Sequence, residues 1–138
     1  MSTDEIRAAL ARSYIASASD DWVWVEAGVA DARLPASPMG FHAQQAIEKL
    51  LKAPLVLAGR PVHKIHDLDL LAAEAEEAWP GLRELVGDAA LVTRWGFAYR
   101  YPHPGPAFAV RPTPERVSSV IADAERLHAF LTERLARA

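Results

Sequence analysis

The chain has 138 residues, of which 51% are hydrophobic and 24% are charged, and its formal net charge is -3. Such a chain can bury one compact core, so a disordered or fibrous protein is excluded, and its slight acidity argues against a surface built for non-specific binding of nucleic acid. The absence of cysteine rules out disulfides, thiolate metal sites and cysteine nucleophiles.

The first two helices are predicted from residues that start, interrupt or stop them. The first helix is predicted over residues 3–33. A break in it is left open at residues 17–21, where Ser, Asp and small residues cluster. Ser37 and Pro38 match an N-cap followed by the first helical position, where the missing N–H of proline would be unpaired in any case. Pro54 lies late in this second helix and crowds the preceding turn, so we expect a kink or an early end there.

Three further helices follow, each with an apolar stripe at helical spacing. Asp67 caps the third helix, and the fourth extends from Leu82 until it fades near Gly96. Thr113 and Pro114 start the last helix. The stripes consist of Leu68, Leu71, Ala72 and Ala75 in the third helix, Leu82, Leu85, Val86, Ala89 and Val92 in the fourth, and Val117, Val120, Ile121, Ala124, Leu127, His128, Leu131 and Leu135 in the last. This pattern predicts an all-α fold, an up-and-down antiparallel bundle of four to five helices, with residues 1–138 in a single domain.

Residues 41–52 (FHAQQAIEKLLK) predict an amphipathic helix with a well defined polar side. Its apolar stripe consists of Ala43, Ala46, Ile47 and Leu50. On the other side lie Gln45, Lys49 and Lys52, and Glu48 is spaced to pair with Lys52 at i, i+4. Two interpretations remain open. The polar side is either a solvated helix face or an anion-binding strip that faces a groove or a second copy, with the Gln45 amide reading a base edge or bridging two chains.

His66 and Asp67 begin the third helix in the segment HDLDLL. The simplest interpretation is structural, because Asp67 can accept backbone N–H groups and is favoured by the helix dipole. In the functional alternative, His66 titrates near neutrality and lies with Arg100 in one cleft. His63 and His66 are spaced like two metal ligands, but no cysteine or carboxylate cluster completes such a site. Neither a metal nor a cofactor is therefore expected.

Arg100, Tyr101 and His103 lie in the segment RYPHPG, within a long loop rich in aromatic residues and proline. These side chains can pin the loop to the core. Arg is also suited to bidentate contact with phosphate, Tyr can stack on a base, and His changes its charge near neutral pH. The sequence gives both interpretations equal weight, since loops of this length are often functional.

Two other patterns receive structural interpretations. Glu125 and His128 form the Glu-x-x-His of di-iron bundles, but no second copy occurs, so His128 is expected at the edge of the core. The four tryptophans are expected to pack in the core, with an exposed dimer face as the alternative. They are Trp22, Trp24, Trp79 and Trp95.

The three motifs, in this order along the chain, resemble the HEPN domain family, helical proteins named for nucleotide binding. Asp20 and Asp21 in the first helix extend the resemblance, which spans most of the chain. It implies a helical bundle that pairs into a homodimer. Many HEPN proteins are encoded beside, or fused to, a minimal nucleotidyltransferase, so it also implies such a protein as partner, in a system of the toxin-antitoxin type. The expected nucleotide or anion site comprises Gln45, Lys49, Lys52, His66, Asp67, Arg100, Tyr101 and His103.

Some HEPN branches are ribonucleases, and these carry an Arg, four to six residues and then a His near the start of the last helix. Arg116 and His128 are too far apart for this pattern, and Arg100 and His103 are too close. We therefore expect a nucleotide- or RNA-binding module rather than an enzyme. The alternatives are a metal-independent ribonuclease toxin and a purely structural dimerising protein. No secretory signal or membrane-spanning run is visible, so a cytoplasmic location is expected.

Overall fold

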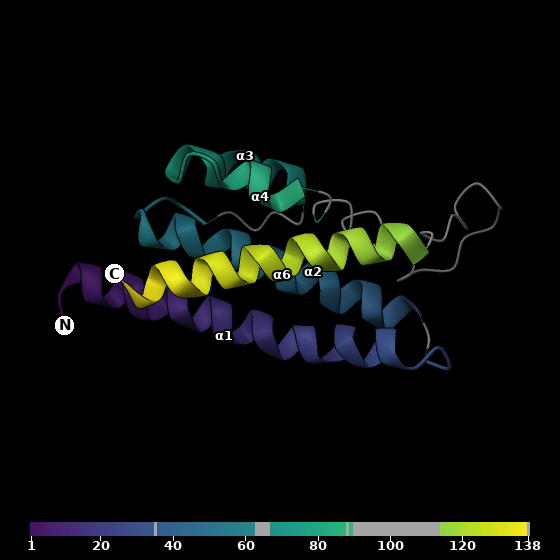
Figure 1. Ribbon diagram of the computed structural model, residues 1–138. Helices are drawn as coiled ribbons and strands as arrows, with labels where there is room; N and C mark the ends of the chain where they lie inside the picture. The colour runs from purple at the N-terminus through teal and green to yellow at the C-terminus, as the bar shows by residue number, and fades with distance from the viewer. Residues whose placement is uncertain (35, 63–66, 88, 90–113, 138) are drawn as a thin grey trace.

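The computed structural model describes residues 1–34, 36–62, 67–87, 89 and 114–137. Within these residues the fold is all-α, as predicted, and contains no strand. The helices are α1 (Thr3–Ala30), α2 (Ala36–Leu57), α3 (Leu68–Ala78), α4 (Leu82–Val86) and α6 (Pro114–Ala136). Figure 1 shows α1 and α2 as antiparallel neighbours, with α6 running in the direction of α2, so that the start of α1 and the end of α6 lie at one end of the bundle.

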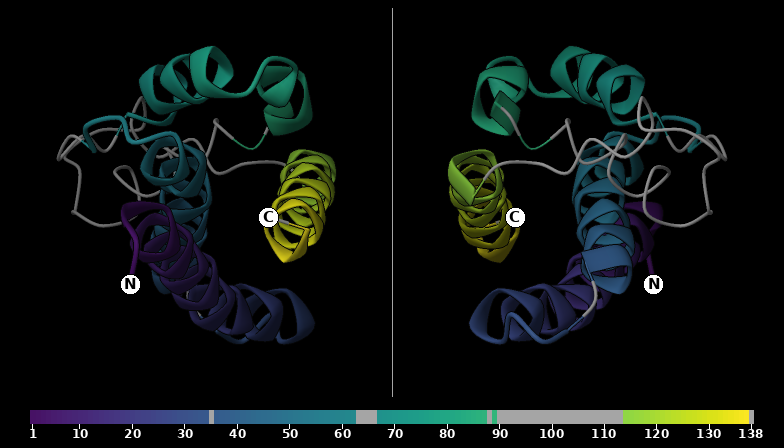
Figure 2. Two further views of the ribbon diagram at one scale, coloured as in Figure 1. Left: turned by 90° about the vertical axis from the view of Figure 1, so that its left-hand side faces the viewer. Right: turned by 90° about the vertical axis from the view of Figure 1, so that its right-hand side faces the viewer.

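Helix α2 is the central element of the bundle. It contacts α1, α3 and α6, and the end-on views place it between α1 on one side and α3 on the other (Figure 2). Each residue from Met39 to Leu57 is buried or half-buried. Of the two interpretations left open for the polar side of this helix, a fully solvated face does not occur, and its polar side chains lie at buried or partly covered positions.

Helix α1 is continuous from Thr3 to Ala30, so the break left open at residues 17–21 does not occur. The Ser19 hydroxyl in this region is satisfied within the helix, because its Oγ donates to the Ile15 carbonyl at 3.1 Å. At the start of the helix, the Ser2 side chain accepts a hydrogen bond from Glu5 N at 3.1 Å. The inward face consists of Ala11, Ile15, Ala18 and Val25.

Helix α2 continues past Pro54 to Leu57, so of the two alternatives expected at that proline, a kink or an early end, the early end does not occur. Pro54 itself is buried, and packing of the following apolar residues holds the last turn. The helix then ends in a Schellman motif, in which Gly59 N donates to Val56 O at 3.0 Å and Arg60 N to Leu55 O at 2.9 Å. Gly59 has a φ of 71°, a conformation that favours glycine.

Helix α3 begins and packs as predicted. The Asp67 side chain caps it, and its stripe of Leu68, Leu71, Ala72 and Ala75 is buried. Helix α4 is much shorter than expected because Gly87, with a φ of 49°, ends it. Its inward residues Leu82 and Val86 are buried, as is Ala89 beyond it. Val92 and Gly96, where the fourth helix was expected to continue, lie outside the described residues.

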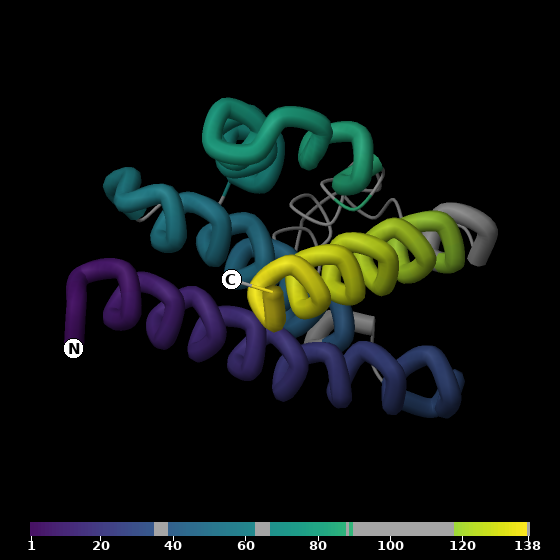
Figure 3. The backbone as a smooth tube through the Cα atoms, turned by 60° about the vertical axis from the view of Figure 1, so that its left-hand side comes forward, coloured from purple at the N-terminus to yellow at the C-terminus, as the bar shows by residue number. Residues whose placement is uncertain are grey.

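Helix α6 begins at Pro114, in agreement with the predicted start. Its buried residues follow the predicted stripe and close the core against α1, α2 and α4. Figure 3 shows the backbone of α6 lying between α1 and the pair of α3 and α4. They are Val120, Ala124, Leu127, Leu131 and Leu135. Ile121 and His128 are half-buried. His128 Nε2 lies 2.8 Å from Ser19 Oγ, which confirms it as a histidine at the edge of the core.

Candidate functional site

A polar cluster joins α1 to α2. Asp21, on α1, lies between two cationic or titratable side chains of α2: its Oδ2 is 2.6 Å from Lys49 Nζ, and its Oδ1 is 2.9 Å from His42 Nδ1. The Asp21 side chain is 12% exposed, whereas those of Lys49 and His42 are 26% and 25% exposed. We call Asp21, His42 and Lys49 the Asp21 cluster. Its carboxylate is nearly covered, while its two partners reach the surface.

The imidazole ring of His42 is held in one orientation by three contacts. Asp21 fixes Nδ1, the Trp24 ring stacks on it with centroids 5.5 Å apart and planes at 16°, and Phe41 meets it edge-on at 5.5 Å. A carboxylate accepts the proton of Nδ1 in this arrangement, which leaves Nε2 as an acceptor in the neutral ring. Within the described residues, Nε2 of His42 has no hydrogen-bond partner.

Helix geometry explains why these residues meet. His42, Gln45 and Lys49 follow one another at i, i+3 and i+7, so they share one face of α2. Asp21 and Trp24 are three residues apart on the facing helix. Gln45 is half-buried between the two cationic positions, and its amide has no hydrogen-bond partner in the described part of the chain. The surface thus combines an exposed aromatic ring, an ammonium group and an amide.

The predicted pair of Glu48 and Lys52 exists, with Glu48 Oε1 3.4 Å from Lys52 Nζ. Its surroundings differ from those expected, because the Glu48 and Lys52 side chains are only 5% and 13% exposed. Removal of one side chain from a buried ion pair lowers the stability of the fold, because the other charge is left buried without compensation. Lys52 therefore has a structural role here, and Lys49 is the better exposed of the two lysines.

Asp67 lies at the start of α3, where its Oδ1 accepts hydrogen bonds from Asp69 N at 3.0 Å and Leu70 N at 3.3 Å. The structural interpretation of this residue as an N-cap is therefore confirmed. Its carboxylate is occupied by the helix that it caps. The other expected site residues, His66, Arg100, Tyr101 and His103, lie outside the described residues.

The tryptophans divide between the two interpretations. Trp22 and Trp79 pack against the core, as predicted. Trp24 does not, since it is 61% exposed; Trp95 lies outside the described residues. Among the described residues, no group of three His, Asp or Glu side chains is arranged to hold a metal ion.

Sequence reasoning missed two members of the Asp21 cluster. Asp21 was noted only for a resemblance, and His42 was not singled out. The spacing of His42, Gln45 and Lys49 on one helical face was visible in the sequence. The partner that His42 and Lys49 share, Asp21 on α1, is more than twenty positions away, and only the fold reveals it.

The fold and this site define a class: a small helical bundle whose first two long helices are antiparallel and share a polar, partly exposed cluster. The family model of the HEPN domain matches residues 36–135, which is more than half of the chain, and the chain belongs to the HEPN domain family. No curated protein and no solved structure matches the sequence. Over the described residues, none of the helices has the length and apolar character that crossing a membrane requires.

Proposed function

We propose that this protein is a nucleotide- or RNA-binding HEPN module that uses the surface of the Asp21 cluster. The observation that carries the proposal is the exposed Trp24 ring, stacked on His42 beside the Lys49 ammonium group. Single-stranded nucleic acid is held without metal by aromatic rings on which bases stack, together with cations along the backbone. Trp24 offers one free face for such stacking because His42 covers the other.

The polar groups beside Trp24 suit the rest of a nucleotide. Lys49 uses one N–H on Asp21, which leaves two donors of the ammonium group for a phosphate oxygen. The Gln45 amide can both donate to and accept from the edge of a base. Asp21 offsets part of the positive charge of Lys49. We therefore expect the surface to bind a nucleotide or RNA with modest affinity and to make few contacts with phosphate groups.

We also propose that the protein forms a homodimer through the first half of α1. Ile6 and Leu10 are 53% and 49% exposed and lie one turn apart on the same face, an arrangement that a second copy can cover isologously. Fourteen residues separate Leu10 from Trp24, about 20 Å along a helix. Such a dimer would therefore leave Trp24 accessible beyond the edge of its interface.

A minimal nucleotidyltransferase as partner, in a system of the toxin-antitoxin type, is the last part of the proposal. It is supported by HEPN family membership. If the reading frame beside this gene encodes such an enzyme, we expect the two proteins to copurify when they are expressed together. Separate elution of the two full-length chains would contradict this part and leave the binding site unaffected.

The salt dependence of RNA binding tests the proposed site. The anisotropy of a labelled single-stranded RNA of about ten nucleotides is measured between 20 and 200 mM salt, as an order-of-magnitude range over which counterion release is readily seen. If Lys49 contacts a phosphate, Lys49→Gln should reduce the slope of log K against log salt by about 0.7. Arg12→Gln, an exposed charge on α1, is the control. Equal slopes in all three proteins would contradict the assignment of Lys49.

One observation favours a metal-independent ribonuclease as a second candidate. His42 is oriented by Asp21, its Nε2 has no hydrogen-bond partner within the part of the chain that the structure describes, and Lys49 supplies a cation on the same face. In such a reaction the ribose 2′-oxygen attacks the adjacent phosphorus as its proton passes to Nε2, and the P–O5′ bond breaks as the 5′-oxygen takes a proton from water. RNA fragments with 2′,3′-cyclic phosphate ends, absent with His42→Gln, would establish this activity. Intact RNA after prolonged incubation with the wild-type protein would exclude it.

A further inference from the structure

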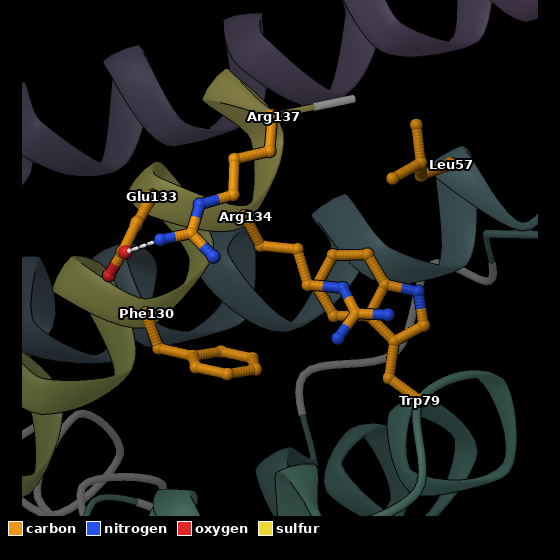
Figure 4. A pocket seen from close by; sticks show the side chains of 6 residues that line it. All are labelled: Leu57, Trp79, Phe130, Glu133, Arg134 and Arg137. Atoms are coloured by element: carbon orange, nitrogen blue, oxygen red, sulfur yellow. Dashed lines mark hydrogen bonds and ion pairs between the residues drawn. The ribbon is translucent and has the colours of Figure 1, made fainter.

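A cavity of about 530 Å³ lies where α2, α3 and α6 end. Figure 4 shows the described residues that line it: Leu57, Trp79, Phe130, Glu133, Arg134 and Arg137. Three of them are apolar and form the walls, while two arginines and one glutamate of α6 provide the polar groups. A mostly apolar cavity of this size with a few convergent polar groups is typical of a small-molecule site. We call it the Trp79 cavity.

The aromatic walls hold a guanidinium group in a defined place. The Trp79 and Phe130 rings meet edge-to-face with centroids 6.4 Å apart, and Arg134 Cζ lies 4.5 Å from the centre of the Trp79 ring. In Figure 4 the Arg134 side chain extends from α6 across Trp79. The position of this cation is therefore set by stacking on the ring.

Arg134 has no ion-pair or hydrogen-bond partner among the described residues. Arg137, by contrast, is paired with Glu133. Stacking uses the face of a guanidinium group and leaves the N–H donors at its edge available for a planar, bidentate contact with a carboxylate or phosphate. As far as the described residues go, the structure thus presents a positioned guanidinium group without an ion-pair partner beside a partly apolar cavity.

We propose that the Trp79 cavity binds a small organic anion that carries a flat ring. The carboxylate or phosphate contacts the edge of Arg134, and the ring packs against Phe130 and Leu57. Two kinds of ligand share this chemistry, a nucleoside monophosphate and an aromatic carboxylate. A neutral ring lacks the contact with Arg134, and a bare phosphate lacks the contacts with the walls.

The alternative role of the two arginines is to offset the partial negative charge at the ends of three helices. In that role Arg134 would be expected to donate to free helix carbonyls, and within the described residues it does not. The cavity is also separate from the Asp21 cluster. Leu57 follows His42 by fifteen residues on α2, about 22 Å along the helix.

The experiment follows the indole N–H resonances of the full-length protein during titration with four compounds. These are adenosine 5′-monophosphate, indole-3-acetate, adenosine and inorganic phosphate. The Trp79 resonance is assigned with Trp79→Phe. We expect a saturable shift of this resonance with one or both ringed anions, and at least tenfold weaker binding of adenosine and phosphate. Tighter binding of adenosine 5′-monophosphate would indicate that the ligand is a nucleoside monophosphate, and tighter binding of indole-3-acetate would indicate an aromatic carboxylate.

Arg134→Gln tests the anion contact, and Arg12→Gln serves as the charge control on another helix. We expect Arg134→Gln to weaken binding at least tenfold and Arg12→Gln to leave it unchanged. The proposal is overturned if neither ringed anion shifts the Trp79 resonance in the wild-type protein, if phosphate alone binds equally well, or if Arg134→Gln binds with unchanged affinity. A shift confined to Trp24 would instead report the Asp21 cluster, so failures at the two sites are distinguishable.

Discussion

Asp21 Oδ1 and His42 Nδ1 lie 2.9 Å apart across the interface of α1 and α2. This contact links two antiparallel helices and fixes the orientation of an imidazole ring whose side chain is 25% exposed. The same carboxylate also holds Lys49. One nearly buried acidic group thus holds both His42, on which Trp24 stacks, and Lys49 at the proposed binding surface.

Loss of the Asp21 carboxylate should lower stability. Asp21→Asn removes the ion pair with Lys49 and weakens the bond to His42, and for a group this well covered we expect a loss of about 1–3 kcal/mol. The measurement is urea unfolding, read as a lower midpoint with an unchanged m-value. Asp20→Asn, at the exposed neighbouring position, is the matched control. Equal midpoints for both variants would contradict the role assigned to Asp21.

The end of α2 depends on a glycine. Gly59 has a φ of 71°, and a Cβ at this position would lie 2.6 Å from Arg7 Cζ. We expect Gly59→Ala to lower the free energy of unfolding by about 1 kcal/mol, because the left-handed conformation disfavours a side chain. Gly59→Asn should cost less, since Asn adopts this conformation more readily. Equal midpoints of thermal unfolding for Gly59→Ala and Gly59→Asn would contradict the importance assigned to the left-handed conformation of Gly59.

The Glu76 carboxylate accepts hydrogen bonds from Gly81 N at 2.9 Å and Arg83 N at 2.8 Å, and it should make the free energy of unfolding depend on pH in the acidic range. Backbone hydrogen bonds from Gly81 and then Arg83 lower the pKa of Glu76 from its ordinary value of 4.5. A carboxylate with a lowered pKa stabilises the fold above its unfolded pKa, and this contribution is lost as the pH falls through the lower folded value. Wild type should therefore exceed Glu76→Gln in stability near pH 6, with a difference that shrinks below about pH 4.5. Thermal melts across this range test the effect, with Glu84→Gln as control; a constant difference would contradict it.

The proposed dimer has a direct test in solution. Leu10→Glu places a charge on the apolar face of α1, so the protein should become monomeric while its helical content is retained. Sedimentation equilibrium measures the mass, and Glu5→Gln, on another face of α1, provides a control. A wild-type protein that is monomeric at high micromolar concentration would refute the dimer.

Local signals made much of the fold predictable. Asp67 and Pro114 mark helix starts. The apolar stripe of α6 was visible because its buried residues recur in the sequence at helical spacing. The end of α4 was missed because Gly87 was not recognised as a stop. The sequence left open whether α2 ends or only kinks at Pro54, and it continues to Leu57 because tertiary packing overrides the local penalty of a proline.

The candidate site was less predictable for a physical reason. Gln45 and Lys49 were identified because they share a helical face, which the sequence displays directly. Their burial depends on the helices around α2, and the bond between Asp21 and His42 depends on the register of α1 against α2. Neither this burial nor this bond can be read from the spacing of residues along one helix. Trp24 was expected to be buried because large aromatic residues usually are, and only the fold shows that its ring is exposed.

The most direct test of the account compares two neighbouring and equally exposed residues of α1. Val23 and Trp24 are both 61% exposed, so truncation of either should leave the fold intact. Base stacking on an aromatic ring contributes about 1–3 kcal/mol, so Trp24→Ala should weaken binding of a single-stranded RNA at low salt roughly tenfold or more, whereas Val23→Ala should leave the Kd unchanged. Equal Kd values for the two variants would contradict the claim that RNA stacks on Trp24.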